Sequence, residues 1–266
     1  MDLSQFSLSQ FSMDGRVVIV TGGSGGIGRG CVRVFARAGA RVVIASLPAD
    51  SIAPAVEEAQ NLGVEALGLA VDVTDETQVA AMVQRSMERF GRIDALINVA
   101  GGTYSRNTEM PQFRRGALQE MDPGDFMRTY EVNVKSAFLC ARAVVPHMQA
   151  QGRGSIVNTG SISGLNLRRQ TGEYSAYGAA KAALHALTVS MAHQWGPEVR
   201  VNCIAPGTID TPRPAGTVRP ELASAAAQID VGRVGTPEDI ANVALFLASD
   251  AAAFVNAAVI PVHGGI

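Results

Sequence analysis

The stretch RVVIVTGGSGGIGRG, residues 16–30, decides the fold, because it joins an apolar run to a glycine-rich turn. A continuous apolar run is typical of a strand that is covered on both faces of a parallel sheet. Gly22, Gly26 and Gly28 follow it, where a tight turn and a close backbone approach require residues without a side chain. Ser24, Gly25 and Ile27 complete the turn. The stretch therefore predicts a strand, a turn and a helix whose free N–H groups can receive a pyrophosphate.

Similar apolar runs recur along the chain and alternate with Ala-rich stretches of helical length. The runs are RVVIVTG (16–22), RVVIAS (41–46), ALGLAVDV (66–73), DALINVAG (94–101), GSIVNTGS (154–161), VRVNCIAPG (199–207) and AAVIPVHGG (257–265). One stretch between them, TQVAAMVQRSMERFG (77–91), carries an apolar stripe and ends at Gly91, which can terminate a helix. This alternation predicts an α/β fold with a Rossmann-like, doubly wound parallel sheet flanked by helices. The ligand crevice is expected at the carboxyl ends of the strands.

Length and composition indicate one globular domain. The chain has 266 residues, of which 47% are hydrophobic and 17% charged, so we expect a single dinucleotide-binding catalytic domain over 15–266. Residues 1–14, in which LSQFS occurs twice, are expected to form a flexible or loosely docked arm. The long connections 102–125 and 207–220 follow strand ends and are candidate substrate walls.

Net charge, hydropathy and the positions of cysteine and histidine limit the kinds of partner that we expect for this chain. The formal net charge is −2 and the basic residues are scattered, which argues against a nucleic-acid partner. No apolar run reaches the length of about 18 residues that a membrane span needs, so we expect no membrane partner and a cytoplasmic location. The three cysteines are far apart and the four histidines lack ligand spacing, so no metal is expected.

The segment EYSAYGAAK (173–181) places two tyrosines ahead of a lysine. On a helix, side chains four residues apart lie about 6 Å from each other, which lets Lys181 reach Tyr177 but not Tyr174. A tyrosine normally titrates near pH 10, and a nearby ammonium group lowers that pKa by favouring the phenolate. Tyr177 is therefore the candidate acid–base group, and Tyr174 is a bystander.

Two further polar residues, Ser161 and Asn133, are candidates for the site because of the elements on which they are expected. Ser161 follows the strand 154–161 on the crevice side, where its hydroxyl could hold a substrate carbonyl oxygen. Asn133 falls within an expected helix, where asparagine most often faces solvent, so by itself it carries little information.

Together these residues resemble the classical short-chain dehydrogenases/reductases, from about residue 15 to the C-terminus. The motifs are Thr21-Gly22-x-x-x-Gly26-Ile27-Gly28, Asp72-Val73, Asn98-x-Ala100-Gly101, Asn133, Ser161, Tyr177-x-x-x-Lys181 and Pro206-Gly207-x-Ile209-x-Thr211, in family order. The resemblance implies a catalytic tetrad: Tyr177 as general acid or base, Ser161 orienting the substrate oxygen, Lys181 holding the nicotinamide ribose, and Asn133 placing a water.

The same resemblance implies the cofactor contacts. Asp72 and Val73 would contact the adenine, Asn98, Ala100 and Gly101 would line the cofactor ribose, and Ile209 and Thr211 would hold the nicotinamide carboxamide. The full expected cofactor set is Gly22, Ser24, Gly25, Gly26, Ile27, Gly28, Ser46, Asp72, Val73, Asn98, Ala100, Gly101, Tyr177, Lys181, Pro206, Gly207, Ile209 and Thr211.

The chain departs from the family pattern at four places. Val99 replaces a usual asparagine, and Ser161 and Tyr177 are slightly farther apart than is usual, so that 164–173 is expected to bulge over the site. His263 stands where many members have an aspartate. The strand over 41–46 ends in Ser46 and not in an acid that binds the ribose diol, and no arginine follows it, so both NAD and NADP remain open as the cofactor.

The leading hypothesis is an NAD(P)-dependent oxidoreductase that interconverts a secondary alcohol and a ketone. The alternative is a non-catalytic dinucleotide-binding sensor or scaffold, which the intact Ser161, Tyr177 and Lys181 disfavour. Within the enzyme class, 3-oxoacyl thioesters, hydroxysteroids and sugars or polyols are all candidate substrates. A homotetramer is expected from the resemblance.

Overall fold

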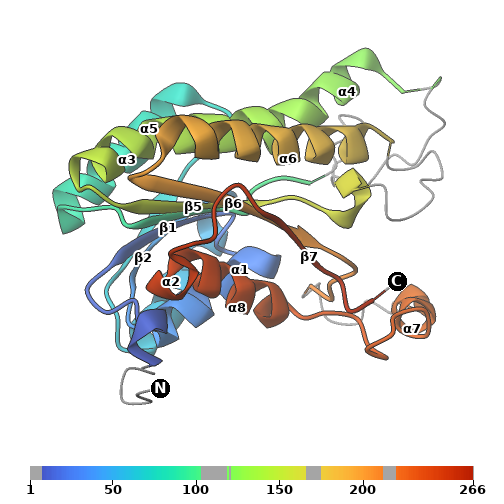
Figure 1. Cartoon of the computed structure of the whole chain (residues 1–266), viewed down its shortest axis with the longest axis horizontal. Helices are drawn as coiled ribbons and strands as arrows, with labels where there is room; N and C mark the ends of the chain where they lie inside the picture. The colour runs from blue at the N-terminus through green and yellow to red at the C-terminus, as the bar shows by residue number, and fades with distance from the viewer. Residues whose placement is uncertain (1–7, 103–118, 120, 166–174, 212–219, 266) are drawn as a thin grey trace.

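One central sheet organises the protein (Figure 1). The structure, a computed structural model, describes residues 8–102, 119, 121–165, 175–211 and 220–265. Its strands are β1 (Val17–Thr21), β2 (Arg41–Ser46), β3 (Ala66–Ala70), β4 (Ala95–Asn98), β5 (Gly154–Thr159), β6 (Val199–Pro206) and β7 (Val259–Val262). They pair in parallel in the order β3-β2-β1-β4-β5-β6-β7. The predicted doubly wound parallel sheet is confirmed, and each strand falls within a predicted apolar run.

Helices cover both faces of the sheet. In Figure 1, α3, α5 and α6 lie on one side of the strands, and α1, α2 and α8 lie on the other. The helices are α1 (Gly26–Arg37), α2 (Ala53–Asn61), α3 (Glu76–Phe90), α4 (Pro123–Tyr130), α5 (Ser136–Ala150), α6 (Ser175–Trp195), α7 (Pro220–Ala226) and α8 (Pro237–Ala248). A π-helical turn, Glu131–Lys135, joins α4 to α5. No helix in these described parts of the chain is both long and apolar enough to cross a membrane.

The two faces of β1 explain its unbroken apolar sequence. Val18 and Val20 belong to the core under α1 and α8, whereas Val17 and Ile19 belong to the core under α3 and α5. All four side chains are fully buried. Because successive strand residues point to opposite faces, a strand between two helical layers needs apolar residues on both faces, as β1 has.

Local signals place α3 as predicted. The Asp75 carboxylate accepts hydrogen bonds from the N–H groups of Thr77 and Gln78, at 2.8 and 3.1 Å, and so caps the start of the helix. Gly91 ends the helix with φ of 73°, a left-handed conformation that glycine adopts without a steric cost. The apolar stripe faces the sheet, with Val79 and Met82 buried.

The end of the N-terminal arm contacts the rest of the protein at Phe11 and Met13. Leu8–Phe11 forms a 3₁₀ turn, and the Phe11 ring lies 6.4 Å from the Phe246 ring on α8. Met13 is fully buried, and its backbone N–H donates a hydrogen bond to the carbonyl oxygen of Ala38, with 2.8 Å between the nitrogen and the oxygen. Met13 is thus part of the core, and the domain boundary expected at residue 15 stays a prediction.

Candidate active site

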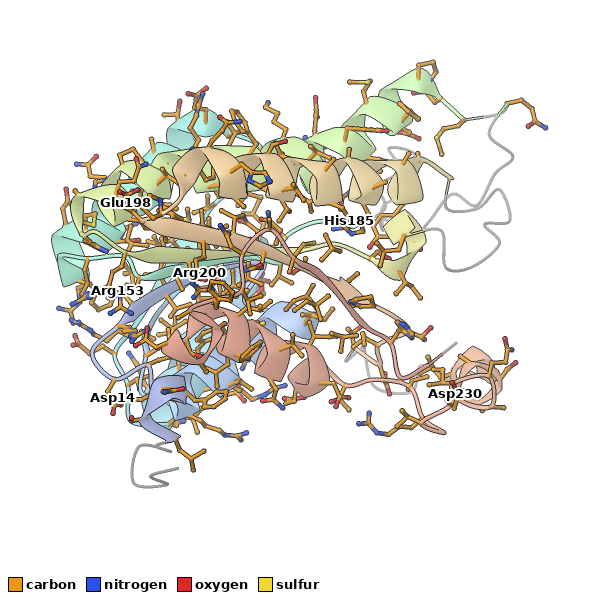
Figure 2. The ribbon with its side chains drawn as sticks, in the orientation of Figure 1. Asp14, Arg153, His185, Glu198, Arg200 and Asp230 are labelled. Atoms are coloured by element: carbon orange, nitrogen blue, oxygen red, sulfur yellow. The ribbon has the colours of Figure 1, made fainter. Side chains whose placement is uncertain are left out.

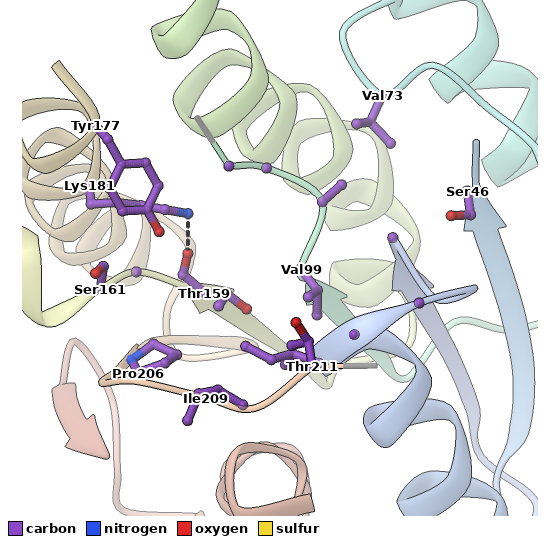
Figure 3. A pocket seen from close by; sticks show the side chains of 18 of the residues that line it. Ser46, Val73, Val99, Thr159, Ser161, Tyr177, Lys181, Pro206, Ile209 and Thr211 are labelled. Atoms are coloured by element: carbon purple, nitrogen blue, oxygen red, sulfur yellow. Dashed lines mark hydrogen bonds between the residues drawn. The ribbon is translucent and has the colours of Figure 1, made fainter. Parts of the chain in front are cut away.

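A cavity of about 950 Å³ opens at the carboxyl ends of the strands (Figure 3). It lies where the strand order reverses between β1 and β4, the usual ligand position in a doubly wound sheet. The predicted site residues that line it are Gly22, Ser24, Gly25, Gly26, Ile27, Ser46, Asp72, Val73, Ala100, Gly101, Ser161, Tyr177, Lys181, Pro206, Gly207, Ile209 and Thr211. Gly28, Asn98 and Asn133 lie outside the lining.

The glycine-rich turn forms a backbone cradle at the start of α1. A Cβ atom on Gly22, whose φ is 66°, would lie 3.1 Å from the Ala100 backbone. A Cβ atom on Gly28 would lie 2.1 Å from the Gly22 carbonyl oxygen, so Gly28 permits packing of α1 against the turn. Gly25 makes no side-chain cap at the start of α1. Such a turn fits a pyrophosphate, which would accept hydrogen bonds from the N–H groups at the helix start.

Three hydroxyl groups meet at the end of β2. Ser24 and Ser46 lie 2.7 Å apart between their Oγ atoms, and Ser51 donates to Ser24 Oγ at 2.8 Å. Asp72, at the end of β3, also lines the cavity and accepts from the Thr74 hydroxyl at 2.7 Å. The end of β2 thus presents hydroxyl groups, and Ser51 is a member that sequence reasoning missed.

The end of β4 is held by a side chain of β1. Thr21 Oγ1 accepts hydrogen bonds from the N–H groups of Val99 and Ala100, at 3.1 and 3.2 Å. Asn98 is buried and donates to Asn158 Oδ1 at 3.0 Å, inside the sheet. The expected contact of Asn98 with a cofactor ribose stays a prediction.

Tyr177 and Lys181 lie together on α6, as their spacing predicts. Lys181 Nζ is 5.6 Å from the centroid of the Tyr177 ring. In Figure 3 both side chains extend from α6 toward the end of β5, where Thr159 and Ser161 lie. The four-residue spacing therefore puts a phenol and an amine at the same wall of the cavity.

The Lys181 amine is held by a backbone oxygen. Its Nζ donates to the Thr159 carbonyl at 2.6 Å, and the side chain is only 3% exposed. Burial lowers the pKa of Lys181 from its ordinary 10.5 to about 8. The amine is consequently still charged at neutral pH, close to the Tyr177 ring.

Ser161 begins a tight turn after β5. Its Oγ accepts a hydrogen bond from the Ser163 N–H at 3.1 Å, and its carbonyl accepts from the Gly164 N–H at 2.9 Å. A hydroxyl that accepts one bond can still donate its own proton. Ser161 lines the cavity, and its hydroxyl proton can be donated to an oxygen atom there.

Asn133 is buried, contrary to the solvent-facing position that is usual for a helical asparagine. It is 1% exposed and sits in the π-helical turn between α4 and α5. Its Nδ2 donates to the carbonyls of Gly102 and Thr129, at 2.6 and 2.8 Å, and its Oδ1 accepts from the Gly102 N–H at 3.0 Å. These bonds tie the chain after β4 to the helix, and the placing of a water by Asn133 stays a prediction.

The end of β6 forms the opposite wall. Pro206, Gly207 and Ile209 line the cavity there. A Cβ atom on Gly207 would lie 2.6 Å from His263 Cβ, so the histidine after β7 packs directly behind this wall. His263, which departs from the family pattern, therefore lies behind the wall of the cavity that Gly207 forms.

Several expectations concern residues outside the described ranges. These are the bystander role of Tyr174, most of the long connection 102–125, the bulge over 166–173, and residues 212–219 of the second connection. Two residues beside the site were not predicted as members of it. Thr159 contributes only its backbone carbonyl, which the residue letters do not reveal, whereas the spacing of four between Lys181 and His185 could have indicated that His185 lies on the same face of the helix.

Comparison with known proteins agrees with this geometry. A family model described as enoyl-(acyl carrier protein) reductase matches residues 22–266. The chain is 35% identical over 262 residues to the 7alpha-hydroxysteroid dehydrogenase of Escherichia coli strain K12, which covers 98% of this chain and 97% of that protein. It is 39% identical over 253 residues to the cis-4-hydroxycyclohexanecarboxylate dehydrogenase of Sinomonas cyclohexanicum, covering 94% and 96% of the two chains. A solved 7 alpha-hydroxysteroid dehydrogenase, complexed with NADH and 7-oxo glycochenodeoxycholic acid, matches with a TM-score of 0.88 and 34% identity over 98% of both chains.

The sheet, the glycine-rich turn and the Tyr–Lys pair define an oxidoreductase with a dinucleotide site. The chain belongs to the classical short-chain dehydrogenase/reductase family. It is an NAD(P)-dependent enzyme that interconverts an alcohol and a ketone.

Proposed function

We propose that Tyr177 transfers the proton between solvent and the substrate oxygen in this reaction. The observation that carries the proposal is the position of Lys181 Nζ, 5.6 Å from the centroid of the Tyr177 ring, in the wall of the cavity. A buried positive charge at that distance stabilises the phenolate form of Tyr177, which can then accept the proton of an alcohol. In the direction of ketone reduction, the phenol donates the same proton.

The residues along the cavity fit a nicotinamide dinucleotide. The backbone cradle of 22–28 would hold the pyrophosphate, the hydroxyl groups of Ser24 and Ser46 would face the adenosine ribose, and Lys181 would bind the nicotinamide ribose. When it is bound, the nicotinamide accepts or supplies the hydride. The protein positions it and handles the proton.

Ser161 would orient the substrate. Its hydroxyl can donate to the substrate oxygen because Oγ already accepts from the Ser163 N–H. A donor aimed at the oxygen on which charge develops stabilises the transition state more than the ground state. Asn133 would contribute by fixing Gly102 at the edge of the cavity and, as in the family, by placing a water near Lys181.

The substrate is inferred to be a secondary alcohol, or its ketone, on a saturated six-membered ring. Two relatives that match nearly the whole chain are named for a 7alpha-hydroxysteroid and for cis-4-hydroxycyclohexanecarboxylate. Both names describe a hydroxyl group on a ring. The cavity lining outside the proposed cofactor set includes Ile162, next to Ser161, which offers an apolar contact to a ring. A panel of cyclohexanols, hydroxysteroids, 3-oxoacyl thioesters and polyols, each assayed with NAD(H) and NADP(H), would test this.

We further propose that the protein works in the cytoplasm as a homotetramer, as the family resemblance suggests. Met127 on α4 and Phe138 on α5 are 57% and 37% exposed, which is consistent with a face that another subunit covers. Sedimentation equilibrium would measure the number of subunits.

Replacement of Tyr177 by phenylalanine tests the proton-transfer role. Because the acid–base group is lost and the ring is kept, we expect kcat to fall by about 10²–10⁴-fold. Dinucleotide affinity, measured by fluorescence titration, should change little. Unchanged turnover in Tyr177→Phe, or the absence of turnover in the native chain with every substrate of the panel, would favour a non-catalytic dinucleotide sensor.

A further inference from the structure

His185 lies on the same face of α6 as the candidate catalytic pair. It follows Tyr177 by eight residues and Lys181 by four, so the three side chains follow one line along the helix. Its side chain is buried, with 7% exposure, and Figure 2 shows it on the side of α6 that faces the sheet. A buried histidine next to a catalytic serine needs a structural or functional explanation.

Two glycines that flank Ser161 form a seat for the imidazole ring. A Cβ atom on Gly160 would lie 2.2 Å from His185 Nε2, and one on Gly164 would lie 2.8 Å from His185 Cε1. Gly160 therefore cannot carry a side chain while His185 keeps its place, whereas at Gly164 the Ala182 backbone nitrogen, at 2.7 Å, excludes a side chain as well. The turn that presents Ser161 thus packs directly against α6 and this ring.

The ring is also bonded to that turn at two points. Its Nε2 accepts the Ser161 N–H at 3.4 Å, and a second hydrogen bond joins the ring to the Gly164 backbone. Because Nε2 accepts a hydrogen bond, a neutral imidazole at this position carries its proton on Nδ1. Protonation of Nε2 would turn the acceptor into a donor and break the bond from Ser161.

The surroundings of His185 favour its neutral form. Burial, and then the charge of Lys181 on the same helix, lower the pKa of His185, whereas its hydrogen bond to Gly164 raises it. Cys203 on β6 also faces this region, since its Sγ would lie 2.8 Å from a Cβ atom on Gly160. Burial raises the pKa of Cys203 to about 12, so its thiol is neutral.

We infer that His185 is a positioning residue that holds the backbone of Ser161 and thereby aims its hydroxyl group at the substrate oxygen. The inference rests on the proposed role of Ser161. His185 does not line the cavity and acts only through the turn that it supports. Its protonation should release Ser161, which gives the reaction an acid limb below the ordinary histidine range.

A set of variants tests this inference. In His185→Leu we expect roughly a tenfold lower kcat with unchanged dinucleotide affinity, because the amide of Ser161 loses its acceptor. In His185→Gln the side-chain amide can accept from Ser161 and donate to Gly164, so kcat should recover to within about twofold of the native value, and the acid limb should disappear. His193→Gln, an exposed histidine on the same helix, is the matched control and should change neither kcat nor the pH profile.

Two readouts separate positioning from general stability. In a Ser161→Ala background, His185→Leu should cause no further loss of kcat, because both changes remove one function. Fully additive losses would overturn the inference. In the native chain, ¹⁵N NMR of the imidazole should show Nδ1 protonated and Nε2 unprotonated at pH 7, and the opposite tautomer would also overturn it. Unchanged turnover in Tyr177→Phe would instead count against the proposed function. The NMR result does not depend on turnover, so the two failures can be told apart.

Discussion

Lys181 Nζ lies 2.6 Å from the carbonyl oxygen of Thr159 and donates a hydrogen bond to it. This bond joins the middle of α6 to the carboxyl end of β5 and holds the amine beside the Tyr177 ring. Among the described residues, no carboxylate forms an ion pair with the amine, so its charge remains available to the phenol. The position has a cost in stability, because a buried ammonium has lost its hydration.

This cost should appear in the pH dependence of stability. The folded-state pKa of Lys181 is about 8 and its ordinary value is 10.5, so between these values the unfolded chain binds more protons than the folded one. The free energy of unfolding should therefore rise with pH across this window, by at most about 3 kcal/mol from this group. Urea unfolding at pH 7.5 and 10.5, compared with Lys181→Met, would isolate the effect. An equal pH response in both proteins would contradict it.

Gly28 should be essential for packing of the first helix. In Gly28→Ala the new Cβ atom would lie 2.1 Å from the Gly22 carbonyl oxygen, so the turn or α1 must shift. We expect a loss of about 1–3 kcal/mol in the free energy of unfolding, together with weaker dinucleotide binding. Gly25→Ala is the control, since its Cβ atom meets no atom within 4 Å, and it should cost less than about 1 kcal/mol. Equal melting temperatures for the two variants would refute the packing argument.

Asn133 should matter for stability as well as for turnover. Asn133→Ala leaves the N–H and carbonyl of Gly102 and the carbonyl of Thr129 without this partner. Buried groups that lose their hydrogen bonds make the variant less stable by about 2–4 kcal/mol. Asn61→Ala, at an exposed position, provides the comparison and should be nearly neutral. Thermal unfolding of both variants measures the difference, and a native-like Asn133→Ala would show that these bonds are dispensable.

Ser46 should influence the choice between NAD and NADP. In Ser46→Asp a carboxylate replaces the hydroxyl that lies 2.7 Å from Ser24 Oγ, and it would repel a 2′-phosphate while accepting from a ribose diol. We expect NADP(H) affinity to fall at least tenfold relative to NAD(H), as measured by fluorescence titration with each nucleotide. Ser190→Asp, which adds the same charge at an exposed position of α6 outside the cavity lining, is the control. If the ratio of affinities stays constant, the ribose does not lie at the end of β2.

Much of the fold could be predicted from the sequence because its signals are local. A strand between two helical layers is mostly apolar on both faces, and this preference marks Val17–Thr21 and gives each of the other described strands its apolar run. The glycine-rich turn of 22–28 and the four-residue spacing of Tyr177 and Lys181 are likewise properties of short segments. By itself, therefore, the sequence determined the strands, the glycine-rich turn and the pairing of phenol with amine.

The remaining features depend on contacts between distant segments, which only the tertiary structure decided. The carbonyl of Thr159 meets Lys181, His185 meets the amide of Ser161, and Asn133 meets the backbone of Gly102. A backbone group carries no signal in the residue letters, and burial of a polar side chain depends on which elements pack over it. The lysine and the histidine therefore owe their lowered pKa values, and the asparagine its buried position, to the packing of helices against the ends of the strands.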